Sequence, residues 1–191
     1  MKVIAINGSS RKGGNTATMI KTVFERLNAE DIKTELLELA GRAPHGCIGC
    51  FKCFEHKDQR CAVTGDIINE CIEAMLAADG ILLGSPSYFA DMSAGMKALI
   101  ERAGMVSRAN DWMFKGKVGA SICVERRAGA TTVLSSMNFF FLQAQMVMPG
   151  SSYWNIGVGR NPGEVSTDTE GIETMRNLGD NFAWVLKKLN S

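Results

Sequence analysis

The chain has 191 residues, of which 46% are hydrophobic, which is enough for one packed core but short for two ordinary domains. We therefore expect a single domain over residues 1–191. Lysine and arginine number 21 against 20 aspartates and glutamates, and this balance argues against binding to nucleic-acid backbone or to anionic membranes. The chain begins at Met1 without a signal sequence and has no apolar run of membrane-spanning length, so we expect a cytoplasmic protein.

The first segment predicts a buried strand, a loop and a helix. Residues 2–7 are short and mostly β-branched or apolar, and residues 8–15 have the composition of a turn. Apolar residues recur at helical spacing from Thr16 to Asn28, and Asn15 stands where an N-cap is expected. The start of the chain therefore predicts one β-loop-α unit.

Strands and helices continue to alternate along the rest of the chain. The pattern predicts further strands over residues 34–39, 80–84 and 118–124, and a short fifth strand over 145–148. It predicts helices over residues 66–78, with Asp66 as the cap, and over 93–103, 130–143 and 168–189. This alternation predicts an α/β fold with a parallel sheet covered on both faces, in which ligands bind beyond the carboxyl ends of the strands.

The loop over residues 8–16, with the sequence GSSRKGGNT, has the composition of a phosphate-binding site. Hydroxyls, a guanidinium and flexible backbone stand directly before a helix N-terminus, where unpaired amides and the helix dipole favour an anion. The spacing of a Walker loop and of a dinucleotide fingerprint is missing, which disfavours ATP hydrolysis and a Rossmann NAD site. An ordinary Gly/Ser turn is the alternative that the residues leave open.

Two more loops follow the third and fourth predicted strands and belong to the same rim of the sheet. Pro86 stiffens the first of them, so that the backbone after it would present fixed donors to a planar heterocycle. The alternative is a Ser-Pro turn whose aromatic side chains fill the core. In the second loop, Arg126 and Arg127 are either anion ligands or simply solvated charges.

Four of the six cysteines lie in a loop at about residues 40–65, with the spacing Cys47-x2-Cys50-x2-Cys53-x7-Cys61. Such tight spacing is typical of loops that bind a [4Fe-4S] cluster. Three alternatives remain, namely a zinc ion, a reducible disulfide pair and free thiols. Zinc ranks lowest because its ligands usually come as two separated pairs.

These motifs together resemble the NADPH-dependent FMN reductase and iron-sulfur flavoprotein family. The resemblance rests on residues 8–16, on GSPSYF at 84–89, on SAGMK at 93–97 with Glu101-Arg102, and on the segment 163–171. It implies a flavodoxin-like three-layer α/β/α sandwich that binds FMN on a five-stranded parallel sheet in the order 2-1-3-4-5. The FMN-binding residues that it implies are Ser9, Ser10, Arg11, Asn15, Thr16, Pro86, Ser87, Tyr88, Phe89, Glu125, Arg127 and Gly129.

The resemblance also implies an FMN-dependent oxidoreductase or electron-transfer flavoprotein. NAD(P)H or ferredoxin would reduce the flavin, and a small acceptor would reoxidise it, with a [4Fe-4S] cluster on the four loop cysteines as an intermediate carrier. Because the flavin carries the chemistry, we expect no catalytic side chain. The alternatives are a cluster-free NAD(P)H quinone, azo or nitro reductase and, from another class, a metal-binding or redox-sensing module.

Tyr153 and Trp154 lie in an irregular, Gly-rich segment. They suggest a homodimer or homotetramer in which these aromatics cover the flavin of a neighbouring subunit. Burial within their own subunit is the alternative.

Overall fold

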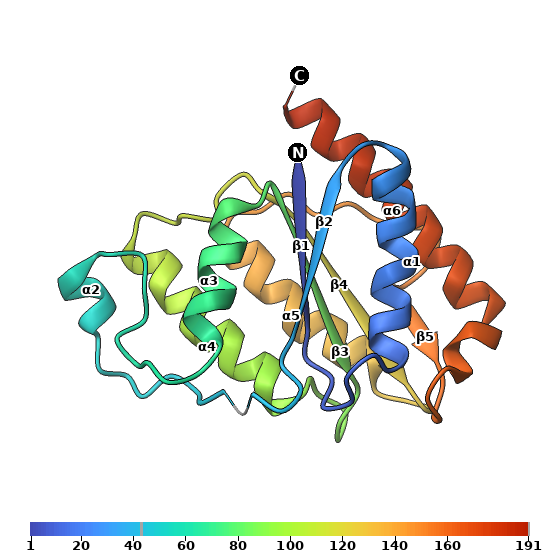
Figure 1. Cartoon of the computed structure of the whole chain (residues 1–191), viewed down its shortest axis with the longest axis horizontal. Coiled ribbons are helices and arrows are strands. Elements are labelled where there is room, and N and C mark those ends of the chain that lie inside the picture. The colour runs from blue at the N-terminus through green and yellow to red at the C-terminus, as the bar shows by residue number, and fades with distance from the viewer. Residues whose placement is uncertain (43, 191) are drawn as a thin grey trace.

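The computed structural model describes residues 1–42 and 44–190, and its centre is a parallel sheet between two layers of helices (Figure 1). The sheet has five strands in the order β2-β1-β3-β4-β5, which confirms the predicted fold class and strand order. The strands are β1 (Lys2–Asn7), β2 (Lys33–Glu38), β3 (Gly80–Pro86), β4 (Val118–Glu125) and β5 (Ile156–Val158).

The helices cover both faces of this sheet. The helices are α1 (Asn15–Ala29), α2 (Lys52–His56), α3 (Ile68–Ala77), α4 (Ala94–Ala109), α5 (Ala130–Gln143) and α6 (Thr169–Leu189), with a short 3-10 helix at Glu164–Thr167. Helices α1 and α6 lie on one face, and α3, α4 and α5 lie on the other (Figure 1). No helix among the described residues is both long and apolar enough to cross a membrane.

Strand β1 shows why the central strands are apolar throughout. Its side chains point alternately to the two faces, so that Val3 and Ala5 pack beneath α1 and α6 while Ile4 and Ile6 face the other layer. All four are fully buried. A parallel strand covered on both faces has no polar side, which explains the continuous apolar run.

The fifth strand is not where the sequence pattern predicted it. Residues 145–148 contribute only an isolated bridge between Val147 and Val118, whereas β5 pairs with the end of β4. The middle of β5 is Gly157, where a Cβ would lie 2.7 Å from both the Met19 and the Val165 side chains. The close approach of α1 requires glycine there, and a three-residue strand with a central glycine has little apolar pattern to detect.

Two helix caps also differ from the prediction. Helix α1 begins at Asn15 itself, with Gly14 in the N-cap position and no side-chain cap. Helix α3 begins at Ile68, two residues after Asp66. The Asp66 carboxylate still accepts a hydrogen bond from the Ile68 N–H at 3.1 Å, but its other oxygen binds Arg102. Asn15 and Asp66 therefore make longer-range contacts in place of simple caps.

Candidate flavin and cysteine sites

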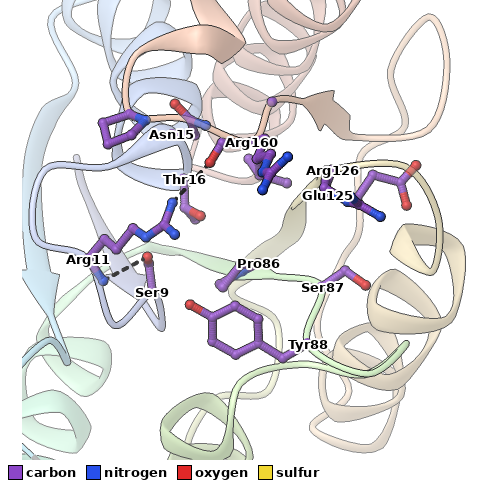
Figure 2. A pocket seen from close by; sticks show the side chains of 13 residues that line it. Ser9, Arg11, Asn15, Thr16, Pro86, Ser87, Tyr88, Glu125, Arg126 and Arg160 are labelled. Atoms are coloured by element: carbon purple, nitrogen blue, oxygen red, sulfur yellow. Dashed lines mark hydrogen bonds between the residues drawn. The ribbon is translucent and has the colours of Figure 1, made fainter.

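A cleft opens at the carboxyl ends of β1, β3 and β4 (Figure 2). Its volume of about 280 Å³ is close to the lower end of the roughly 300–1,000 Å³ typical of ligand sites. Its walls come from four separate loops. The lining residues are Ser9, Arg11, Asn15, Thr16, Pro86, Ser87, Tyr88, Val124, Glu125, Arg126, Gly159, Arg160 and Pro162.

The loop before α1 is held in place by hydrogen bonds that leave the helix start free. Asn7 Oδ1 accepts from the Ser9 N–H at 3.0 Å, and Ser9 Oγ accepts from the Arg11 N–H at 3.1 Å. Glu38, at the end of β2, accepts from the Gly13 N–H at 2.9 Å. Since no side chain caps α1, the first amides of this helix remain available to an anion.

The loop that follows β5 closes one side of the cleft. Arg11 Nη1 donates to the Arg160 carbonyl at 2.9 Å, and Asn15 Nδ2 donates to the Asn161 carbonyl at 2.9 Å. The Glu164 carboxylate accepts from the backbone N–H groups of Asn161 and Arg160, and these hydrogen bonds lower the pKa of Glu164. The two loops thus support each other although they are far apart in the sequence.

One consequence of this closure is an unsatisfied acceptor in the cleft wall. With its Nδ2 donating to Asn161, Asn15 has its Oδ1 buried and without a donor among the described residues. Buried polar atoms without a partner are rare, and they often belong to ligand sites. The orientation of Asn15 therefore suggests that a ligand supplies a hydroxyl or N–H group at this point.

The turn after β3 is tied to both neighbouring loops. Ser10 Oγ and Tyr88 Oη are 2.9 Å apart, which joins the first loop to this turn. Gly129 packs against the other side of the turn with φ +99°, where a Cβ would lie 2.6 Å from Ser87 Oγ and 2.9 Å from Ala90 Cα. Both the positive φ and the close approach require glycine at position 129.

The backbone of this turn corrects one sequence expectation. The Ser87 N–H donates to the Val124 carbonyl at 2.8 Å, and the Tyr88 N–H donates to the Asp91 carbonyl at 2.8 Å. These two amides are therefore already paired and are not free donors to a heterocycle. What Ser87 and Tyr88 offer to the cleft is their side chains.

Four of the predicted FMN-binding residues do not line the cleft. Ser10 contacts the Tyr88 hydroxyl, and Gly129 packs against the turn. Phe89 is fully exposed at the tip of the turn, where its backbone has φ +51°. Arg127 lines a neighbouring, more open cavity.

Five lining residues are absent from the sequence prediction, namely Val124, Arg126, Gly159, Arg160 and Pro162. Arg126 was recognised as a possible anion ligand, and Val124 is the buried neighbour of the predicted loop. The other three belong to the loop after β5, where the run of arginine, asparagine, proline and glycine was the available signal. Its closeness to α1 depends on the position of β5, which the pattern did not show.

The four loop cysteines surround a second, small cavity next to α4. Cys47 and Cys50 are exposed, whereas Cys53 and Cys61 are partly buried, and burial raises the pKa of the Cys53 thiol. All of these thiols are free in the structure. The cavity is lined by the four cysteines together with Phe51, Ala62, Arg102, Met105 and Val106.

The cysteines surround the cavity rather than converge on one point. Within residues 1–42 and 44–190, no three cysteine, histidine or acidic side chains are close enough together to hold a single metal ion. Four thiols on the walls of one cavity are the donor set of a [4Fe-4S] cluster, which is held by thiolates from its outside.

The remaining two cysteines belong to the core. Cys71 and Cys123 are fully buried, as the sequence suggested. Burial raises the pKa of Cys71 to about 12 and raises that of Cys123 as well. Both thiols therefore stay protonated and unreactive.

Comparison of the chain with known proteins identifies its family. The model of the NADPH-dependent FMN reductase family matches residues 1–161. The chain is 37% identical over 194 residues to an iron-sulfur flavoprotein of Methanocaldococcus jannaschii, covering 98% of both chains. It is 30% identical over 189 residues to an iron-sulfur flavoprotein of Methanosarcina thermophila, covering 98% of this chain and 96% of the relative.

A likeness among solved structures supports the fold. The WrbA-like flavodoxin of Agrobacterium tumefaciens superposes with a TM-score of 0.67 at 15% identity, covering 98% of this chain and 97% of that protein. The flavodoxin-like sheet order agrees with this match. The family match and the sequence relatives together show that the chain belongs to the NADPH-dependent FMN reductase family and is an oxidoreductase.

Proposed function

We propose that this protein is an electron-transfer oxidoreductase that binds FMN in the cleft and a [4Fe-4S] cluster in the cysteine cavity. The electron donor would be NAD(P)H or ferredoxin, and the final acceptor a small molecule. When bound, FMN supplies both hydride and one-electron chemistry, and the protein orients the ring and sets its potential. The observation that carries the proposal is the uncapped start of α1 beside the unpaired Asn15 Oδ1.

The groups at the start of α1 fit a phosphate monoester. Ser9 Oγ accepts from the Arg11 N–H, so the Ser9 hydroxyl hydrogen remains free to donate. The Arg11 guanidinium donates from Nη1 to the Arg160 carbonyl and has further N–H groups that can donate to an anion. Thr16 adds a hydroxyl in the first turn of the helix. These groups would therefore bind the phosphate by charge-assisted hydrogen bonds at a helix N-terminus.

Asn15 extends this fit from a phosphate to FMN. A phosphate dianion only accepts hydrogen bonds, so it cannot satisfy the Asn15 Oδ1 acceptor. The ribityl chain of FMN carries hydroxyls that donate. Tyr88 and Pro86 stand on the opposite wall of the cleft, where they supply apolar surface for a planar ring (Figure 2).

We further propose that electrons are exchanged between subunits. The cleft and the cysteine cavity share no lining residue. We therefore propose a homodimer or homotetramer in which the flavin of one subunit lies near the cysteine loop of another. Tyr153 and Trp154 are each 57% exposed, so burial within their own subunit does not explain these aromatics.

Anaerobic purification of the full chain, with FMN, iron and zinc quantified, tests the proposal. We expect about one FMN and about four irons per chain, together with flavin absorption bands and a broad brown shoulder. FMN without iron after anaerobic reconstitution would favour the cluster-free quinone, azo or nitro reductase. A colourless, zinc-containing protein that fails to take up FMN would overturn the proposal in favour of a metal-binding module.

A further inference from the structure

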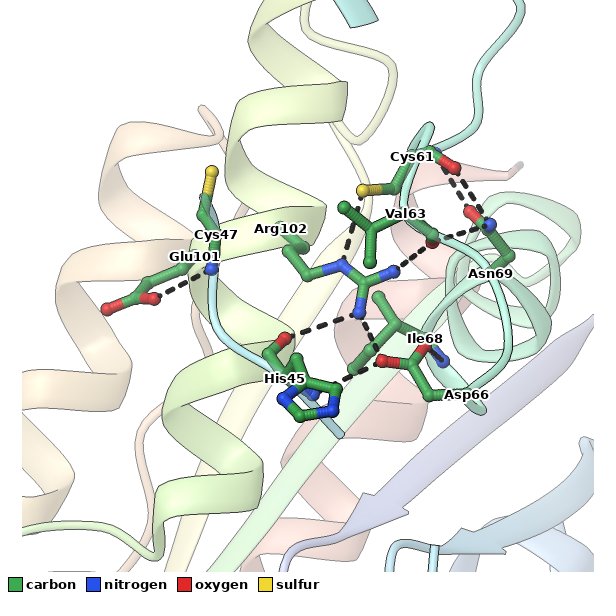
Figure 3. Close-up of polar contacts among 9 residues, drawn as sticks. All are labelled: His45, Cys47, Cys61, Val63, Asp66, Ile68, Asn69, Glu101 and Arg102. Atoms are coloured by element: carbon green, nitrogen blue, oxygen red, sulfur yellow. Dashed lines mark hydrogen bonds and ion pairs between the residues drawn. The ribbon is translucent and has the colours of Figure 1, made fainter. Parts of the chain in front are cut away.

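Arg102 is a fully buried arginine in the middle of α4 (Figure 3). Its Nε donates to Cys61 Sγ at 3.2 Å, and its Nη1 donates to the His45 carbonyl at 3.2 Å. Nη1 also pairs with the Asp66 carboxylate, and Nη2 donates to the Val63 carbonyl. One side chain thus joins α4 to both ends of the cysteine loop.

The ion pair keeps this arginine charged inside the protein. Burial by itself lowers the pKa of Arg102, but hydrogen bonds to Asp66 and Cys61 outweigh that effect and raise it above its ordinary value. A buried charge costs several kcal/mol unless it is paired and hydrogen-bonded. Asp66 and the two carbonyls take three of the five guanidinium N–H groups, and Nε directs a fourth at a sulfur atom.

Cys61 is held in position independently of any metal. Its N–H donates to Asn69 Oδ1 at 2.8 Å, and its carbonyl accepts from Asn69 Nδ2 at 2.9 Å. The backbone is thus fixed by Asn69 and the sulfur by Arg102. Among the four cavity cysteines, Cys61 alone accepts a hydrogen bond at sulfur from a charged side chain in the part of the chain that the structure describes.

We propose that Arg102 is a positioning residue of the cysteine site, which sets Cys61 Sγ as a cluster ligand and raises the reduction potential of the cluster through its N–H···S bond. This inference rests on the cluster proposed above. Reduction adds one electron and therefore one negative charge to a thiolate-bound cluster, and a cationic donor at a ligand sulfur stabilises that form more than the oxidised one.

Two variants separate this role from a purely structural one. Arg102→Lys keeps a positive charge opposite Asp66 but lacks the Nε donor to Cys61. The double change Arg102→Met with Asp66→Asn removes both charges, so that no unpaired charge is left buried. Arg108→Gln is the matched control, because Arg108 is exposed on the same helix and lines a neighbouring cavity with Cys47, but has no hydrogen bond to a cysteine among the described residues.

The measurement is a spectroscopic redox titration of the anaerobically reconstituted full chain, with iron content and circular dichroism recorded for each variant. We expect both Arg102 variants to have a more negative cluster potential than the wild type, and to lose iron to a chelator at roughly 10-fold or more lower chelator concentration. The Arg108→Gln control should shift the potential less than either Arg102 variant, because it removes a nearby charge but no N–H···S bond.

The possible failures are distinguishable. Folded Arg102→Lys protein with wild-type iron content and wild-type potential would overturn the role of Arg102 while leaving the cluster in place. An equal shift in Arg108→Gln would also overturn it, because the effect would then be a general charge effect. Wild-type protein that takes up no iron would overturn the cluster site itself, and this inference with it.

Discussion

Glu101 and Arg102 are consecutive residues of α4, and they contact the first and the last cysteine of the cavity. Glu101 Oε2 accepts from the Cys47 N–H at 3.1 Å, while Arg102 Nε donates to Cys61 Sγ at 3.2 Å. Neighbouring side chains on a helix point about 100° apart, so the pair can hold two separate parts of the loop. One turn of α4 therefore closes the cysteine loop around its cavity.

The contact of Glu101 predicts a local effect on the start of this loop. Glu101→Ala removes the acceptor of the Cys47 N–H, and we expect faster amide hydrogen exchange around Cys47 with a stability loss of about 0.5–1.5 kcal/mol. Glu101→Gln keeps a side-chain acceptor and should remain close to wild type. Unchanged exchange at Cys47 in the alanine variant would show that the hydrogen bond does not hold the loop.

Two adjacent residues of the loop before α1 offer a matched pair of variants for testing FMN binding. Arg11 lines the cleft, whereas its neighbour Lys12 carries the same charge and does not. We expect Arg11→Ala to weaken FMN binding by about 1.5–3 kcal/mol, or roughly 10- to 150-fold in Kd. Lys12→Ala should change Kd by less than about 3-fold, because exposed charges contribute little. Quenching of flavin fluorescence measures both, and equal losses would argue against a specific Arg11 contact.

Asn15 predicts a difference between FMN and inorganic phosphate. Asn15→Leu removes the Oδ1 acceptor that we assign to a ribityl hydroxyl, so FMN should bind about 5- to 10-fold more weakly, equivalent to about 1 kcal/mol. Phosphate, measured as a competitor for the cleft, should keep its affinity because it does not use this acceptor. A parallel loss for both ligands would mean that Asn15 acts on the loop as a whole.

The close packing of Gly129 against the turn after β3 predicts that the stability of the protein depends on glycine at this position. Gly129→Ala forces a residue with φ +99° to carry a Cβ close to Ser87 Oγ, and we expect a loss of about 1–3 kcal/mol in the free energy of unfolding. Gly150→Ala is the control, since a Cβ there meets nothing within 4 Å. Urea unfolding of the two variants compares them, and equal stability would contradict the packing of the two loops.

The ion pair between Asp66 and Arg102 predicts that part of the free energy of unfolding is lost at acidic pH. Burial alone would raise the pKa of Asp66, but hydrogen bonds from Arg102 and from the N–H groups of His45 and Ile68 bring it below its ordinary value of 3.8. A carboxylate with a depressed folded-state pKa contributes stability above its unfolded pKa, and that contribution is lost as the pH falls through the folded value. The stabilisation should therefore be complete at neutral pH and decline below about pH 4.

Unfolding measured between pH 7 and pH 2 checks this expectation. The double variant Asp66→Asn with Arg102→Met should show a smaller loss of stability on acidification than the wild type, because the titrating pair is gone. Asp31→Asn, which changes an exposed aspartate outside the pair, should keep the wild-type pH dependence. An identical slope in the double variant and the wild type would show that Asp66 does not carry the effect.

Local signals explain what could be predicted before the structure. The β1-loop-α1 unit and the spacing of the cysteines are contiguous in the sequence, and a strand, a turn or a ligand run each leaves its pattern within a few residues. For the same reason the parallel sheet and the rim that carries Pro86 and Tyr88 followed from the alternation of strands and helices, whereas the strand order was implied by the family resemblance.

The remaining features depend on contacts between distant segments. Arg160 lines the cleft from the loop after β5, a strand whose central Gly157 leaves room for the side chains of Met19 and Val165. In the sequence, Arg102 looks like an ordinary charged residue of a helix. It donates to Cys61 only when the cysteine loop folds over α4, and Asp66 then becomes its ion-pair partner. The sequence by itself determined the fold class and the positions of the loop before α1 and of the cysteine run. Tertiary packing decided which distant side chains complete each site, because burial and pairing energies exist only once those segments meet.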